Sequence, residues 1–234
     1  MGGESEATVR ISTTDLTAIV GMRGSGKTTL TRGLIEIAGE QGVKNIVVYD
    51  PLREYDNPEV ERYVPTTPWG QAEFDALCKK LAYRGNCWFV VEEADRYLPQ
   101  RGLIPQWASI LVNQGRHYGI GMVAISRRIA SLSKDYFSLC EHLCIYRLWI
   151  PNDINYIREF LPREQANRVA ILPKYHFLYF SSEETDTYTL QGGRLIKIGK
   201  AAIPPREKGP ISPRGETKRG NYPAPTRGAS KVSG

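Results

Sequence analysis

A glycine-rich stretch at residues 21–28 constrains the fold of this chain more than any other feature. It reads GMRGSGKT and matches the pattern G-x-x-x-x-G-K-[ST] of a phosphate-binding loop, or P-loop. An apolar run at residues 16–20 precedes it, and a run of helical character at residues 30–35 follows it. We therefore predict a strand, a tight loop and a helix in that order, since a glycine-rich turn that arose by chance would not require this placement.

The side chains of the P-loop predict a nucleoside triphosphate, taken to be ATP, and Mg²⁺ as ligands. Glycines allow backbone conformations that a side chain forbids, so successive N–H groups can turn inward around phosphate oxygens. Lys27 is expected to reach the β- and γ-phosphates, and the Thr28 hydroxyl to ligate Mg²⁺. The positive end of the following helix also favours an anion. The residues predicted to bind the nucleotide are Gly21, Arg23, Gly24, Ser25, Gly26, Lys27, Thr28 and Thr29.

The net charge of +6 is concentrated at the C-terminal end of the 234-residue chain. Residues 203–234 hold seven Lys or Arg and two acidic residues, with six prolines and five glycines. This composition predicts a disordered tail that contacts DNA phosphates or an acidic capsid or membrane surface, the alternative being a solvated tail that only aids solubility. The rest of the chain is long enough for one domain, at residues 13–202, after an N-terminal arm at residues 1–12.

Apolar runs alternate with helical segments along the domain. Strands are predicted at residues 16–20, 45–50, 87–91, 122–126 and 143–148, and helices from 27 to 39 or 42, around 74–81, and at 106–114, 152–161 and 163–171. Continuous apolar strands that alternate with helices are typical of a parallel sheet covered on both faces, an α/β fold. The runs at 176–182 and 187–190 predict an antiparallel hairpin at one edge, and 195–198 one more short strand.

The four cysteines indicate a reducing compartment rather than a disulfide framework, and we expect a cytoplasmic protein. Cys140, His142 and Cys144 are close enough in sequence to suggest zinc, but no second cysteine pair lies at ligand spacing, which favours buried thiols. No run of 18 apolar residues exists, so no transmembrane helix is expected.

Polar residues follow the predicted parallel strands. The carboxyl ends of parallel strands share the edge of a sheet where ligands bind, so these residues are expected to join the P-loop in one site. They are Asp50 after the second strand, Glu92 and Glu93 after the third, and Ser126, Arg127 and Arg128 after the fourth.

Two adjacent carboxylates beside a P-loop suggest a division of labour in ATP hydrolysis. Glu92 would hold Mg²⁺ through water, and Glu93 would polarise the water that attacks the γ-phosphate. Ser126 would touch the γ-phosphate or that water. Acidic residues that simply end a strand in solvent, and a plain strand-end serine, are the alternatives.

Arg116 lies just after the predicted helix at 106–114. Hydrolysis needs positive charge as negative charge develops on the phosphoryl oxygens, and an arginine finger from a neighbouring subunit can supply it. An arginine at this place can also cap the carbonyl end of its own helix. The residues alone leave both roles open.

Four segments together resemble the HerA/FtsK superfamily of DNA-pumping ATPases. They are the P-loop, the segment DPLREY at residues 50–55, the pair Glu92-Glu93 and the segment GRHYGIG at residues 115–121. The P-loop is shared by many NTPases, whereas the second and fourth segments are more selective. The resemblance extends over residues 13–180.

This resemblance implies a RecA-like (ASCE) sheet, in which the strand at 122–126 lies between the P-loop strand and the strand at 87–91. It also implies an ATP-driven double-stranded DNA translocase that forms a ring, expected to be a hexamer. Nucleotide would lie between subunits, with Arg116 as the finger in trans, and DNA would pass through the centre. Arg96 and Arg101, in the loop after Glu93, are candidates to face this pore, the alternative being ordinary surface arginines of a loop.

Two departures from the family pattern concern the site. The family often has Asp where Glu92 stands, a tolerable exchange because the metal contact is usually through water. It tends to have glutamine after the position of Ser126, where this chain has Arg127 and Arg128. A second arginine that faces phosphate or DNA is therefore one interpretation of Arg127 and Arg128.

The chain offers no stretch for an N-terminal β-barrel, a membrane anchor or a winged helix, so a bare motor is expected. Such a motor resembles the genome-packaging ATPases of tailless, membrane-containing viruses, and its partners would include capsid-vertex or internal membrane proteins. A viral protein of this kind would act in the host cytoplasm or docked on the virion vertex. A cellular HerA-like DNA-processing ATPase, a small-molecule kinase and a nucleotide-dependent switch are the alternatives.

Overall fold

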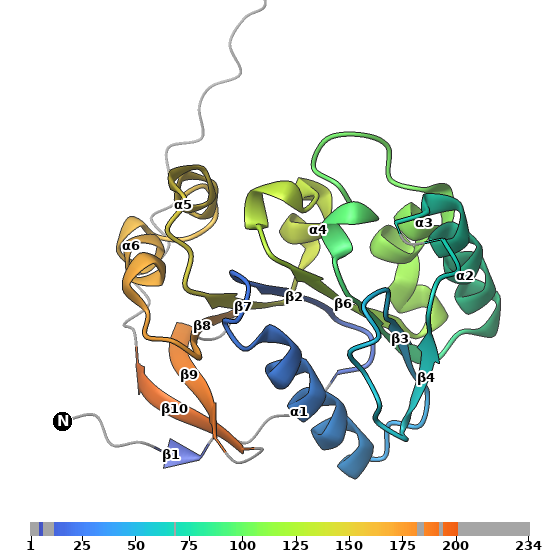
Figure 1. Ribbon diagram of the computed structural model, residues 1–234, viewed down its shortest axis with the longest axis horizontal. Coiled ribbons are helices and arrows are strands. Elements are labelled where there is room, and N and C mark those ends of the chain that lie inside the picture. Colours follow the sequence, from blue (N-terminus) through green and yellow to red (C-terminus); the bar gives the residue numbers. More distant parts are fainter. Residues whose placement is uncertain (1–4, 7–11, 68, 182–184, 192–193, 201–234) are drawn as a thin grey trace, which may run out of the picture. The chain divides into compact units, whose positions relative to one another are not determined.

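A mixed sheet of ten strands runs through the part of the chain that the structure describes, residues 5–6, 12–67, 69–181, 185–191 and 194–200 of a computed structural model. The strands are β1 (Ser5–Glu6), β2 (Leu16–Val20), β3 (Ile46–Tyr49), β4 (Val60–Tyr63), β5 (Cys87–Val91), β6 (Ile120–Ser126), β7 (His142–Tyr146), β8 (His176–Ser181), β9 (Thr185–Gln191) and β10 (Arg194–Lys200). Their order across the sheet is β1-β10-β9-β8-β7-β2-β6-β5-β3-β4 (Figure 1).

Six α-helices and three short 3₁₀ helices connect these strands. The α-helices are α1 (Lys27–Glu40), α2 (Gln71–Arg84), α3 (Gln106–Gln114), α4 (Lys134–Leu139), α5 (Pro151–Ile157) and α6 (Arg163–Ile171), and the 3₁₀ helices are η1 (Ala94–Arg96), η2 (Gly115–Tyr118) and η3 (Ile129–Ser131). In Figure 1, α1 lies on one side of the sheet, and α2, α3 and α4 lie on the other. The prediction of helices on both faces is therefore confirmed.

The strands that carry the predicted site are parallel and central. β2 pairs in parallel with β6 on one side and with β7 on the other, and β6 pairs in parallel with β5. This arrangement puts β6 between the P-loop strand and the strand that precedes Glu92, as the resemblance implied. The ends of β2, β5 and β6 consequently meet at one edge of the sheet.

The C-terminal strands extend the sheet in antiparallel fashion. β8 pairs with β7 and with β9, and β9 pairs with β10. The predicted edge hairpin is thus confirmed, and the extra strand expected at 195–198 is longer, Arg194–Lys200. The short β1, which lies within the segment predicted as an arm, pairs with β10.

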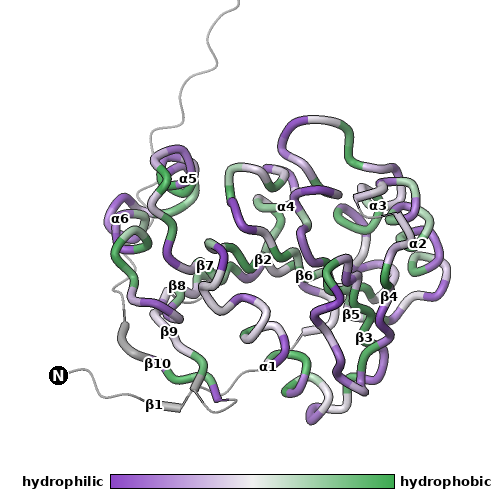
Figure 2. The backbone as a smooth tube through the Cα atoms, viewed as in Figure 1, coloured by the Kyte–Doolittle hydropathy of each residue, from purple (hydrophilic) through white to green (hydrophobic). Residues whose placement is uncertain are grey.

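Two apolar clusters hold the helices to the sheet because successive strand residues point to opposite faces. In β2, Leu16, Ala18 and Val20 join a cluster with side chains from α2 to α6. Ile19 joins a second cluster with Leu30, among other side chains of α1. Hydrophobic colour accordingly follows the central strands in Figure 2. Nearly continuous apolar strands are what burial on both faces requires.

The sequence-based assignment misses or misplaces several elements. It contains no strand at β4, because that edge strand has the sequence VERY and is only partly buried. Helix α5 ends at Ile157, where residues 152–161 were expected to be helical. The strand expected at 143–148 ends at Tyr146. Each discrepancy lies at a sheet edge or an element end, where burial specifies the local structure least.

Two expectations concern parts of the chain that the structure leaves out or tests only in part. The tail predicted at residues 203–234 lies outside the described residues. Among the helices that are described, none is both long enough and apolar enough to cross a membrane.

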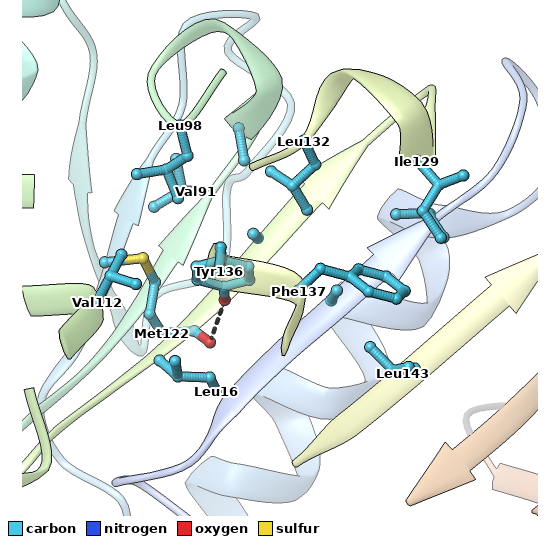
Figure 3. Packing of buried hydrophobic residues seen from close by; sticks show 14 of the residues in the cluster. Leu16, Val91, Leu98, Val112, Met122, Ile129, Leu132, Tyr136, Phe137 and Leu143 are labelled. Atoms are coloured by element: carbon cyan, nitrogen blue, oxygen red, sulfur yellow. Dashed lines mark hydrogen bonds between the residues drawn. The ribbon is translucent and has the colours of Figure 1, made fainter. Parts of the chain in front are cut away.

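Helix α4 is anchored to the sheet by one buried hydroxyl. Tyr136 is fully buried, and its hydroxyl lies 2.9 Å from the carbonyl oxygen of Thr17 and 2.8 Å from that of Met122. Figure 3 shows the ring among apolar side chains with the bond to Met122 drawn. A single donor shared by neighbouring strands β2 and β6 ties the helix to the centre of the sheet.

Replacing Tyr136 by Phe is expected to lower the free energy of unfolding by about 1–2 kcal/mol, because two buried carbonyls lose their shared donor. Urea denaturation measures the change. Tyr83→Phe is the matched control, since that side chain is 76% exposed, and it should leave stability unchanged. Equal stability of Tyr136→Phe and the wild type would contradict the proposed anchor.

Candidate active site

The P-loop connects β2 to α1 at the centre of the sheet, where it has little space. A Cβ added to Gly21 would lie 2.5 Å from Cβ of Tyr146, so only glycine fits there. Gly24 and Gly26 have φ angles of +73° and +108°, in the region that favours glycine. The Gly21 amide donates to the Ser126 carbonyl at 3.2 Å, which joins the loop to the end of β6.

Lys27 is folded back onto its own loop. Its Nζ donates to the carbonyl oxygens of Gly21 at 2.7 Å and Met22 at 3.1 Å. Burial lowers the pKa of Lys27, and the nearby Glu92 and Glu93 partly oppose this effect. Within the described residues, the buried hydroxyl of Ser25 has no hydrogen-bond partner. A cationic donor on two carbonyls and an unpartnered hydroxyl are groups that phosphate oxygens would satisfy.

The segment after β3 brings a carboxylate to Thr28. The Thr28 hydroxyl donates to Oε2 of Glu54 at 3.2 Å. Glu54 is held there by Asp50, a fully buried residue whose two carboxylate oxygens accept the amides of Glu54 at 2.9 Å and Tyr55 at 3.0 Å. Asp50 therefore shapes this segment. Sequence reasoning placed Asp50 among the strand-end residues but did not assign Glu54 to the site, although the DPLREY motif contains it.

Glu92 is buried at the end of β5 and is only 4% exposed. The Tyr55 hydroxyl donates to its Oε1. Burial raises the pKa of Glu92 to about 7; Glu54 adds to this increase, and the Tyr55 hydrogen bond and Lys27 oppose it. Together with Thr28 and Glu54, Glu92 forms a group of oxygen ligands with negative charge. Such a group suits a hard divalent cation such as Mg²⁺, which its oxygens could bind directly or through water.

Glu93 follows in a left-handed conformation with φ of +51°, uncommon for a residue other than glycine. Its Oε1 forms an ion pair with Nη2 of Arg127 at 2.5 Å. Its side chain is 10% exposed and that of Arg127 is 47% exposed. The predicted catalytic base is therefore held by an arginine of its own chain.

Ser126 and Arg128 are committed to contacts within the chain. The Ser126 hydroxyl lies 3.0 Å from Oδ1 of Asp95 and accepts the amide of Arg128 at 3.2 Å. The Arg128 guanidinium pairs with the fully buried Asp153 at 3.4 Å. The two arginines at the end of β6 thus diverge, and only Arg127 turns toward the predicted catalytic residues.

Arg116 lies at the amino ends of the parallel strands, opposite the P-loop. It belongs to η2, directly before β6, and its side chain is 68% exposed. Nη2 lies 3.3 Å from Oδ1 of Asp15 and 3.6 Å from Oε1 of Glu141. The last turn of α3 is instead closed by the Gly115 amide, which donates to Leu111. These contacts do not support the alternative in which Arg116 caps its own helix.

A hydrogen-bonded chain surrounds Asp15 at the same ends of the strands. Burial by itself would raise the pKa of Asp15, but hydrogen bonds from His142, Ser12 and Arg116 outweigh it and lower that pKa. His142 Nε2 lies 3.1 Å from Asp15, and Nδ1 lies 2.8 Å from the Tyr179 hydroxyl. Both nitrogens of His142 are therefore engaged.

The predicted zinc alternative finds no support. Cys140 packs against the first apolar cluster and Cys144 lies in the second. Across the described ranges, no three His, Cys, Asp or Glu side chains form a group that could hold a metal by themselves.

The residues predicted to face a pore lie at the end of η1 and in the loop that follows it. The Arg96 guanidinium lies 5.3 Å from the ring centroid of Trp69. Arg101 is exposed, and Leu103 beyond it is 88% exposed. This loop follows β5, as do Glu92 and Glu93.

Comparison with known proteins bears on the fold. The chain matches no protein-family model, and no curated protein is significantly similar to it in sequence. The DNA-packaging ATPase B204 of Sulfolobus turreted icosahedral virus has a similar structure, with a TM-score of 0.68 and 17% identity over 77% of this chain and 100% of that chain. The structure of B204 from Sulfolobus turreted icosahedral virus 2 in complex with ATP-γS is also similar. Its TM-score is 0.67, and the sequence identity is 19% over 76% of this chain and 98% of that chain.

A third similar structure is the conjugation coupling protein TcpA of pCW3, with a TM-score of 0.57 and 15% identity over 75% of this chain and 60% of that chain. At identities this low, the structural similarity shows the fold alone. The chain has an α/β P-loop NTPase fold, as its sequence predicted.

Replacing Glu92 by Gln is expected to stabilise the nucleotide-free protein much more at pH 8 than at pH 5. Because burial raises the pKa of Glu92 to about 7 from 4.5, the folded protein binds this proton more tightly than the unfolded chain does. Stability from this group is complete below pH 4.5 and is lost as the pH rises through 7. The neutral amide should remove a penalty on the order of 3 kcal/mol.

Urea denaturation at both pH values, without nucleotide or Mg²⁺, measures this effect. The Gln side chain keeps an oxygen that can accept the Tyr55 hydroxyl. An equal change in stability at pH 5 and pH 8 would contradict the titration of Glu92.

Proposed function

We propose that this protein is an ATP-hydrolysing motor that moves double-stranded DNA as a homo-oligomeric ring, expected to be a hexamer, in viral genome packaging. The observation that carries the proposal is the separation of charges across the sheet. Lys27, Glu92 and Glu93 gather at the carboxyl ends of the strands, and Arg116 lies exposed at the opposite ends.

In this proposal the loop and the strand ends divide the chemistry. Lys27 exchanges its two backbone carbonyls for β- and γ-phosphate oxygens. Thr28 and Glu92 hold Mg²⁺, with Glu54 beside them; the ion would neutralise charge on the phosphates and help to orient them. Glu93, once released from Arg127, accepts a proton from the attacking water. Ser126 supports the end of β6 beside the γ-phosphate.

Arg116 acts in trans in this proposal. β6 spans Ile120–Ser126, and the six steps of about 3.3 Å between its seven residues separate its ends by about 20 Å. An arginine side chain cannot cover that distance to the nucleotide of its own chain. Presented to a neighbour, the exposed guanidinium could stabilise the negative charge of hydrolysis there. Asp15 and Glu141 would orient it.

The proposal also names the contacts with DNA and with docking partners. Arg96, Arg101 and the exposed loop around Leu103 would contact DNA in the central pore. The basic segment at residues 203–234 would add phosphate contacts or bind a capsid or membrane surface. A viral motor would work in the host cytoplasm or docked on the virion vertex. Structural similarity to B204, a DNA-packaging ATPase, favours packaging over a cellular HerA-like role.

ATP hydrolysis should be stimulated by long double-stranded DNA and should require both halves of the site. Glu93→Gln and Arg116→Ala are each expected to lower the stimulated rate at least about 100-fold, because they remove the base and the finger. Steady-state phosphate release measures both. DNA-insensitive turnover would favour a switch, and transfer of phosphate to a small acceptor would favour a kinase.

Mixing the two variants tests whether the site is shared between subunits. An Arg116→Ala subunit keeps Glu93, and a Glu93→Gln subunit supplies the arginine. In an equal random mixture about a quarter of the interfaces are complete, so part of the activity should return. A mixture as inactive as each variant alone would contradict a finger in trans.

The ion pair between Arg127 and Glu93 should restrain hydrolysis in the absence of DNA. Arg127→Ala frees the carboxylate, so the basal ATPase rate is expected to rise several-fold, on the order of 3–10, and DNA stimulation to shrink. Arg128→Ala is the matched control, because Arg128 pairs with Asp153 instead. A basal rate that falls in Arg127→Ala would assign Arg127 to the phosphates.

A further inference from the structure

An open hollow adjoins the P-loop on the β7 side of the sheet. One wall is the P-loop itself, at Arg23 and Ser25. The others are the end of β7, at Tyr146, the following residue Trp149, and Tyr175 in the segment before β8. The Tyr146 hydroxyl donates to the Gly26 carbonyl at 3.2 Å, which fixes this side of the loop.

The order of the strands sets the direction of a bound triphosphate. This step rests on the proposed function. Glu92 and Glu93 follow β5, which is separated from β2 by β6, so the γ-phosphate points to that side. The α-phosphate and the nucleoside must then leave the P-loop toward β7, the other neighbour of β2. The hollow lies where the nucleoside would emerge.

Two aromatic rings are exposed around this hollow. Tyr175 is 52% exposed and has a φ of +66°, a conformation that side chains rarely adopt. Its ring lies against the P-loop, since a Cβ added to Gly26 would be 3.3 Å from Cδ1 of Tyr175. Trp149 is 56% exposed. The cationic groups of Lys174 and Arg147 lie 4.7 and 5.3 Å from the centroids of these two rings.

We propose that this hollow is the nucleobase subsite, in which the base stacks on the Tyr175 ring and Trp149 closes the outer wall. Every base has a π face, and base–aromatic stacking is tolerant of base identity. Among the described residues, none of the side chains that line the hollow is Asp, Glu, Asn or Gln, the types that best pair with the edge of a base. The subsite therefore accepts adenine and guanine nucleotides alike.

The test compares ligands with and without a base. Isothermal titration calorimetry on the full-length chain measures Mg²⁺-bound AMPPNP, GMPPNP and inorganic tripolyphosphate. Tyr175→Ala should weaken AMPPNP about tenfold and leave tripolyphosphate within about twofold, because only the stacked base loses its partner. Tyr175→Phe keeps an aromatic face and should bind like the wild type.

A second variant guards against misfolding at Tyr175. Trp149→Ala should weaken AMPPNP binding by a smaller factor, about threefold, and again leave tripolyphosphate binding nearly unchanged. Tyr83→Ala is the matched control, because Tyr83 is 76% exposed on α2, and it should change nothing. GMPPNP should bind the wild type within about threefold of AMPPNP.

Three results would overturn the inference. The first is an AMPPNP affinity that is unchanged in both Tyr175→Ala and Trp149→Ala. The second is a loss of tripolyphosphate affinity in Tyr175→Ala as large as its loss of AMPPNP affinity, which would mean damage to the P-loop. The third is a preference of the wild type for AMPPNP over GMPPNP beyond about thirtyfold. A wild-type protein that binds no tripolyphosphate would instead overturn the proposed function, and this inference with it.

Discussion

The parallel pairing of β2 on both sides is the constraint on which the site depends. β6 and β7 are hydrogen-bonded along the two flanks of β2, and the chain leaves the end of β2 through a tight loop between them. Gly21 meets Tyr146 of β7 on one side and the Ser126 carbonyl of β6 on the other. The same pairing fixes which groups surround a bound phosphate and on which side a nucleoside would lie.

A buried polar network connects the residues proposed to hold Mg²⁺ to the core. Asp50 accepts two backbone amides, and these hold Glu54 near Thr28 and Tyr55 under Glu92. The network has a cost, since burial raises the pKa of Glu92 to about 7. Residues held at such a cost are typical of sites that gain a charged ligand.

The charged side chains of the proposed site lie at opposite ends of the parallel strands of one sheet. In the proposed function, Glu93 and Arg116 of one chain stand at opposite ends of parallel strands, so one subunit would offer half of the arrangement that hydrolysis needs. Glu93 is also paired with Arg127, so its carboxylate would have to be released before it could act as the base. Both features are consistent with the proposed motor, whose activity would depend on neighbouring subunits and on DNA.

The P-loop, the parallel α/β fold and the strand-end residues could be predicted from the amino-acid sequence, because glycine spacing and apolar runs are local consequences of backbone freedom and two-sided burial. Arg116 was also singled out in this way. The contacts of these residues came only from the three-dimensional packing: Asp50 supports the segment after β3, Glu54 lies beside Thr28, Arg127 pairs with Glu93, and Arg128 pairs with Asp153. Those contacts join residues far apart in the chain, and the direction of a side chain follows from packing between strands, which no local pattern records.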